Sequence, residues 1–107
     1  MRRIILKGVN PNHFPEITPV SDNQYSLVLG ANQQQVVQIP DDARYVIYNS
    51  DADFYVAYGE SVNIPTDTVG LSSTNTEYNP GQRFIGDKKD IRIKVPQLAH
   101  IHLSFYA

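Results

Sequence analysis

The sequence has no cysteine, no tryptophan and no long apolar run. Without cysteine it can form no disulfide bond and no thiolate zinc site, and it has no thiol nucleophile. No stretch approaches the ~18 apolar residues of a membrane span. The apolar run near the start, residues 4–6, is shorter than the ~7–15 residues of a signal-peptide core. We therefore expect a soluble, unprocessed chain without membrane contact, in which residues 2–7 form the first strand.

An excess of basic charge is also missing. Nine Lys and Arg stand against eleven Asp and Glu, a formal net charge of −2, whereas nucleic-acid binders usually carry a clustered basic surface. Four basic residues lie between positions 88 and 94, but Asp87 and Asp90 interrupt them. We interpret this stretch as a solvated turn and strand face, and we expect no nucleic-acid partner.

The pattern that is present is the two-residue period of β-strands. In residues 90–95, Ile and Val alternate with charged side chains, and residues 100–106 repeat the alternation with Ile101, Leu103 and Phe105 on one face. Successive side chains of a strand point to opposite faces, so each segment has one dry side. The sequence predicts about eight strands, at residues 2–7, 24–29, 34–39, 44–49, 53–58, 82–85, 90–95 and 100–106.

The fold class follows from these strands. No segment has the apolar stripe of an amphipathic helix, and seven prolines are scattered through the 107 residues. The length fits one domain. We predict a single antiparallel β-sandwich, jelly-roll-like, spanning residues 1–107. The short polar loop at residues 50–52 is of hairpin length, so the strands at 44–49 and 53–58 are expected to pair.

Two segments do not follow the strand rhythm. Residues 10–23 carry three prolines and are predicted to form an extended connection, and residues 60–81 form a long polar loop. Such a loop is either a mobile surface feature or ordered by another protein chain, because Asn, Ser, Thr and Tyr supply uncharged contacts. Our candidate protein-contact residues are Tyr55, Asn63, Thr66, Asn75, Tyr78, Asn79, His100, His102 and Tyr106.

Groups for catalysis are few. The chain has no nucleophile-elbow motif and no glycine-rich phosphate loop. His100 and His102 project from the same strand face and are the candidates for a metal site. The pair resembles the start of the metal motif of cupins, but the glutamate, glycine and third histidine that continue it are missing here. We expect no catalytic residue, metal or cofactor, with the histidines lining a solvent face or a subunit interface.

Three stretches carry a family resemblance: residues 51–58 (DADFYVAY), 77–81 (EYNPG) and 103–107 (LSFYA). In this order they resemble small proteins encoded among tailed-phage virion genes, over residues 36–107, although Tyr78 stands where that family has leucine. The resemblance implies a capsid cement or decoration protein, often a trimer, that binds the major capsid protein on the phage head. It would be soluble in the host cytoplasm before assembly. Residues 2–23 and 60–81 would then be contact elements.

Alternatives remain open. A head–tail joining or tail component fits the same sandwich and differs in copy number, since a joining protein forms one ring and a cement protein covers the head. A carbohydrate-binding module is a further alternative, although its usual tryptophan platform is missing. A cupin-like metalloenzyme using His100 and His102 is the remaining one, and metal analysis of the purified protein would test it.

Overall fold

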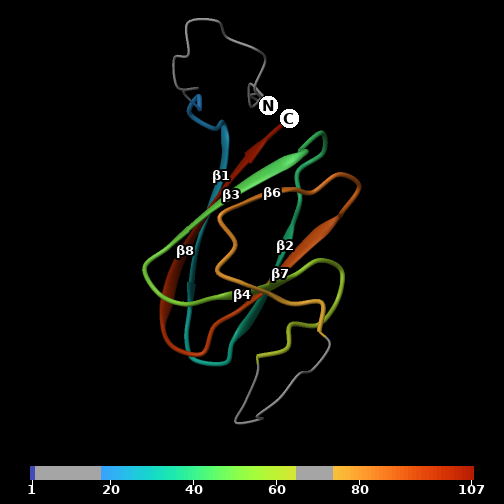
Figure 1. Cartoon of the computed structure of the whole chain (residues 1–107). Helices are drawn as coiled ribbons and strands as arrows, with labels where there is room; N and C mark the ends of the chain where they lie inside the picture. Colours follow the sequence, from blue (N-terminus) through green and yellow to red (C-terminus); the bar gives the residue numbers. More distant parts are fainter. Residues whose placement is uncertain (2–17, 65–73) are drawn as a thin grey trace, which may run out of the picture.

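The computed structural model describes Met1 and residues 18–64 and 74–107 (Figure 1). These residues contain β-strands and no helix, so the predicted all-β class is confirmed. In the same residues, no helix is long and apolar enough to cross a membrane. The predicted strand at residues 2–7 lies outside the described residues. The strands are β1 (Asn23–Leu29), β2 (Gln34–Gln38), β3 (Tyr45–Ser50), β4 (Tyr55–Ala57), β5 (Glu77–Tyr78), β6 (Gln82–Phe84), β7 (Asp90–Lys94) and β8 (Ala99–Tyr106).

The strands form two four-stranded antiparallel sheets, which confirms the predicted β-sandwich. Sheet A has the order β1-β8-β3-β6 and sheet B the order β2-β7-β4-β5. The pairings are nested: β1 with β8, β2 with β7, β3 with β6, and β4 with β5. A chain folded back on itself and then rolled produces this order, which is that of a jelly roll.

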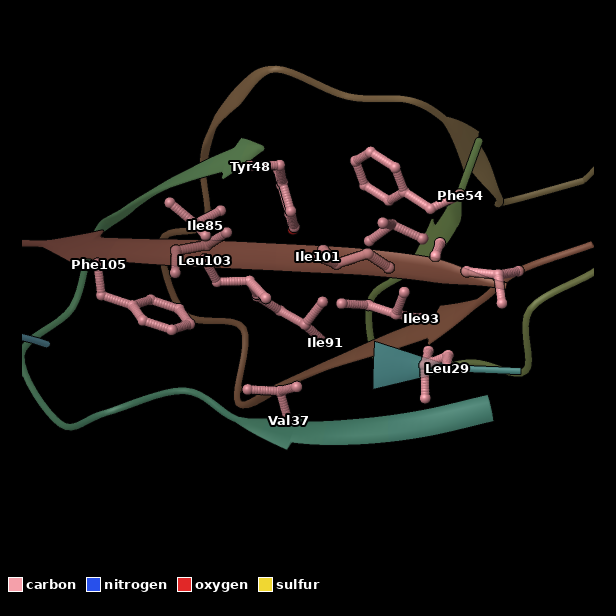
Figure 2. Close-up of a cluster of buried hydrophobic side chains, with 14 of the residues drawn as sticks. Leu29, Val37, Tyr48, Phe54, Ile85, Ile91, Ile93, Ile101, Leu103 and Phe105 are labelled. Atoms are coloured by element: carbon pink, nitrogen blue, oxygen red, sulfur yellow. The ribbon is translucent and has the colours of Figure 1, made fainter. Parts of the chain in front are cut away.

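The core lies between the sheets, where the inward side chains of β7 and β8 meet. Figure 2 shows Ile91 and Ile93 of β7 close to Ile101 and Leu103 of β8, and none of the four is more than 1% exposed. Burying one such side chain contributes about 1.5–3 kcal/mol. The alternation of apolar and polar side chains in the sequence therefore indicates which face of each strand is covered by the other sheet. The wider core also includes Leu29, Val37, Ala43, Val46, Tyr48, Phe54, Val56, Ile85, Val95, Ala99 and Phe105.

The predicted hairpin between β3 and β4 is wrong. β3 pairs with β8 and β6 in sheet A, whereas β4 pairs with β7 and β5 in sheet B. Residues 51–54 form an arch that crosses from one sheet to the other, so that Tyr48 and Phe54 approach across the core, with ring centroids 5.7 Å apart. Asp51 attaches this arch to β8, donating its N–H to the His100 carbonyl (3.2 Å) and accepting the His100 N–H on Oδ1 (2.8 Å).

The predicted polar loop at residues 60–81 is not irregular throughout, because it contains β5. This two-residue strand places Tyr78 opposite Tyr55 and Glu77 opposite Val56. Residues 65–73 of the loop, with Thr66, lie outside the described residues.

The last part of the predicted extended connection, residues 18–22, runs to the start of β1 beside the end of β8. Ser21 is 6% exposed, and its hydroxyl donates to the Phe105 carbonyl at 2.7 Å. The Tyr106 hydroxyl donates to the Pro19 carbonyl at 2.6 Å. These bonds hold the segment against the C-terminal strand.

Candidate functional site

His100 and His102 lie on the outer face of sheet A, as the strand alternation predicts. His102 is hydrogen-bonded through both ring nitrogens to β1, with Nδ1 3.0 Å from Ser26 Oγ and Nε2 2.9 Å from Gln24 Oε1. His100 Nδ1 lies 2.7 Å from Asp51 Oδ2 in the arch. The two rings therefore join β8 to its neighbours.

A metal ion on this pair would have to displace these bonds. Across residues 1, 18–64 and 74–107, no three His, Cys, Asp or Glu side chains are grouped to hold a metal. The His100 backbone N–H, and then its ring, hold the pKa of Asp51 below its ordinary 3.8. Asp51 thus stays charged at neutral pH and keeps the arch on β8.

The outer face of sheet A also carries an apolar cluster at its β6 edge, which we call the Phe84 patch: Tyr45, Ile47 and Phe84. Tyr45 and Phe84 face each other across β3 and β6, with ring centroids 5.3 Å apart. Phe84 is 67% exposed, while its neighbour Ile85 is 3% exposed and part of the core. An exposed ring beside half-buried apolar side chains is typical of a protein-contact surface.

A second aromatic pair lies on the outer face of sheet B. Tyr55 of β4 and Tyr78 of β5 have ring centroids 5.0 Å apart, and Tyr78 is 55% exposed. The hydrogen bond to Asp53 is the main cause that raises the pKa of Tyr78. Two residues predicted as contact candidates from separate segments therefore form one surface.

An open pocket of about 440 Å³ lies between the arch and the turn that follows β5, and neither Tyr55 nor Tyr78 lines it. Asn79 shapes one wall of the pocket. Its backbone is in the left-handed region (φ 47°), its Oδ1 accepts the Phe54 N–H at 2.8 Å, and its Nδ2 donates to Asp53 Oδ1 at 3.1 Å. The pocket is lined by Tyr48, Asn49, Ser50, Asp51, Ala52, Asp53, Phe54, Asn79, Pro80 and Gly81.

The remaining predicted contact residues do not belong to the surface formed by Tyr55 and Tyr78. Asn63 N–H donates to Thr76 Oγ1 at 3.0 Å, and Asn75 Nδ2 donates to Glu60 Oε2 at 2.8 Å. Both residues are exposed and connect the two described arms of the long loop. The assignment of Tyr106 to a contact surface is corrected, because its side chain is 4% exposed and its hydroxyl is bonded to Pro19 within the chain.

Polar side chains also meet between the sheets, near the β5 and β6 edges. The hydroxyls of Tyr48 and Tyr58 lie 2.8 Å apart, and Arg83 Nε donates to Glu77 Oε2 at 2.7 Å, joining β6 to β5. Burial raises the pKa of Tyr58 to about 12 and moves the pKa of Tyr48 higher still. Both phenols remain protonated at neutral pH, so they are suited to hydrogen bonding and not to acting as general bases.

Comparisons with protein-family models, with curated proteins and with solved structures gave no match. The surfaces described above therefore carry the functional argument. The sequence analysis named Tyr55, Tyr78 and Asn79 as contact candidates, and it did not name Phe84 or Asn49. The signal for Phe84 was its place next to Ile85 in a short predicted strand, where only one of the two can face the core.

Proposed function

We propose that this chain is a non-enzymatic structural protein of a phage virion, a cement or decoration protein that binds capsid subunits on the head. The observation that carries the proposal is the jelly-roll strand order, an architecture that viral capsid domains use together with lectins and cupins. This is an argument by analogy of fold. The resemblance of residues 36–107 to small virion proteins points to the first of these three classes.

The histidines favour a structural role over a cupin-like one. Both ring nitrogens of His102 are already bonded to β1, and His100 is bonded to Asp51. In a cupin, equivalent imidazoles would be free to face a metal. Here they stiffen the sheet that presents the Phe84 patch, which is what a binding surface requires.

The Phe84 patch is the surface that we assign to the capsid shell. It lies at an edge of sheet A, where the outer side of β6 offers backbone groups for a further strand. A trimer on the head would place three such patches around one axis, in the way that symmetric oligomers repeat a single contact. Buried aromatic side chains supply most of the energy of such contacts.

The test is co-sedimentation of the purified chain with capsid shells from the phage whose genome encodes it. We expect saturable binding that Phe84→Ser weakens by about tenfold or more, the effect of losing one aromatic anchor. Leu98→Ser is the matched control, because Leu98 is similarly exposed (61%) but lies in the loop before β8, outside the patch. Shells that bind neither native nor control chain would contradict the proposal. Saturation at one ring per particle would instead indicate a head–tail joining role.

A further inference from the structure

We infer that copies of this chain associate through the side of the sandwich formed by β1 and β2, which we call the uncharged side (residues 23–40). These residues include no Asp, Glu, Lys, Arg or His, whereas charged residues make up 19% of the whole chain. The Phe84 patch lies at the opposite edge of sheet A, on β6. The inference therefore goes beyond the proposed virion role and does not depend on it.

Both strands of the uncharged side are sheet edges. Among the described residues, β1 pairs with β8 alone and β2 pairs with β7 alone. One short turn joins the two strands, so their edges lie on the same side of the sandwich (Figure 1). β1 has seven residues and β2 five, whereas β6 and β5 at the opposite side have three and two. About half of the backbone N–H and C=O groups of such an edge point outward, where another strand can bond to them.

These two edges lack the features that usually prevent edge pairing. Soluble proteins commonly block a free edge with a charged side chain, a proline or a bulge. β1 (NQYSLVL) and β2 (QQVVQ) contain neither proline nor charge, and their pairing with β8 and β7 runs without a bulge. β1 also exposes Val28 (62%) and Tyr25 (40%). The Tyr25 ring packs edge-on against the buried Phe105 ring, with centroids 5.6 Å apart, so it can join a contact with little loss of conformational freedom.

The absence of charge favours a second copy of this chain as the partner. In a symmetric oligomer, residues near the axis lie close to their own counterparts in the neighbouring copy. A charged side chain there would meet the same charge and oppose association, whereas a glutamine amide both donates and accepts and can bond to an identical amide. Gln34 and Gln38 of β2 are exposed, and their side chains have no hydrogen-bond partner among the described residues. A strongly charged partner would find no opposite charge on residues 23–40.

The experiment is sedimentation equilibrium of the full chain over a range of concentrations, in the absence of any other protein. We expect the native chain to form a discrete oligomer whose mass is a whole multiple of 12.1 kDa. Val28→Lys should weaken association by about tenfold or more, because it places like charges at the contact, and added salt should restore part of the loss. Val28→Thr, which stays uncharged, should associate like the native chain. So should Val20→Lys, the same change at an exposed position (75%) outside the uncharged side.

Cross-linking locates the contact directly. The chain has no cysteine, so a single cysteine introduced by Val28→Cys can be joined by a flexible bismaleimide only to another copy. Phe84→Cys, at a similarly exposed position (67%) on the far edge of sheet A, is the matched control. We expect covalent dimers from Val28→Cys and none from Phe84→Cys.

Three results would overturn the inference: a native chain that stays monomeric up to ~1 mM, a Val28→Lys chain that associates as tightly as the native one, or cross-linking through Phe84→Cys but not through Val28→Cys. None of them touches the virion proposal, which a monomer that binds capsid shells through the Phe84 patch would still satisfy. Circular dichroism spectra of each variant verify the fold. Val20, Val28 and Phe84 are all exposed, so their replacement should not unfold the chain.

Discussion

Asn79 is the side chain whose removal should most disturb the joint between the arch and β5. Its Oδ1 accepts the N–H of Phe54, a residue that is 4% exposed, and its own N–H donates to the Phe54 carbonyl at 2.9 Å. Its backbone has φ 47°, a conformation that Asn tolerates better than most residues. Asn79→Ala therefore removes the side-chain acceptor and places an ordinary side chain in the left-handed region.

The two effects add to a measurable loss. A buried amide left without its acceptor costs about 1–3 kcal/mol, and the lower half applies here because the bond is only part-buried. The left-handed conformation costs alanine about 1–2 kcal/mol. We expect Asn79→Ala to lower the free energy of unfolding by about 2–4 kcal/mol, or the melting temperature by about 8–30 °C. Urea titration followed by tyrosine fluorescence and circular dichroism measures this loss.

Asn79→Asp is the matched control for this substitution. Aspartate keeps the acceptor for Phe54 and tolerates positive φ, but it repels Asp53, so a loss of about 0.5–1 kcal/mol is expected. The reasoning fails if Asn79→Ala lies within ~0.5 kcal/mol of the native chain, or if alanine and aspartate are equally costly.

Three further predictions concern the core and the titrating groups. Ile93→Ala, at a position 0% exposed, should cost about 2–5 kcal/mol in urea titration; a loss under ~1 kcal/mol would mean that the sheets do not pack there. Because the folded pKa of Tyr58 is raised to about 12, its contribution to stability is complete below the ordinary 10.0 and lost as pH rises through about 12. Alkaline unfolding followed by phenolate absorbance should show this, with a smaller loss in Tyr58→Phe. Because the folded pKa of Asp51 is lowered from 3.8, its contribution is present above 3.8 and lost as pH falls through the folded value; urea midpoints of Asp51→Asn should be lower than native at neutral pH and converge with native in acid.

The strands could be predicted because apolar residues on the covered face of a strand alternate along the sequence with polar residues on its exposed face. Ile91 and Ile93 alternate with charged side chains, and in the structure the two isoleucines are buried while the charged side chains are half-buried. β5 could not be found this way, since two residues are too few to show a period. The pairing of β3 was mispredicted because a three-residue loop can close a hairpin or cross between sheets. Only the neighbouring strands decide between the two.

The candidate site was predictable only in part for a similar reason. Tyr55 and Tyr78 stand out as aromatics in polar surroundings, but their contact depends on a pairing between distant segments. Asn49 is a common residue type. Only the structure shows that its side chain is exposed and has no hydrogen-bond partner among the described residues. Tyr106 alternates outward like His102, yet the chain before β1 covers it, through the bond to Pro19.

The central claim, that this chain is a structural component of a phage head, is tested most directly by quantitative mass spectrometry of purified virions. The particles should come from the phage whose genome carries this sequence, with peptides of the major capsid protein as the internal standard. The account predicts that the protein is present in the hundreds of copies, in a fixed ratio to the capsid subunit, as a symmetric shell requires. Absence of its peptides from particles that contain the major capsid protein would contradict the claim.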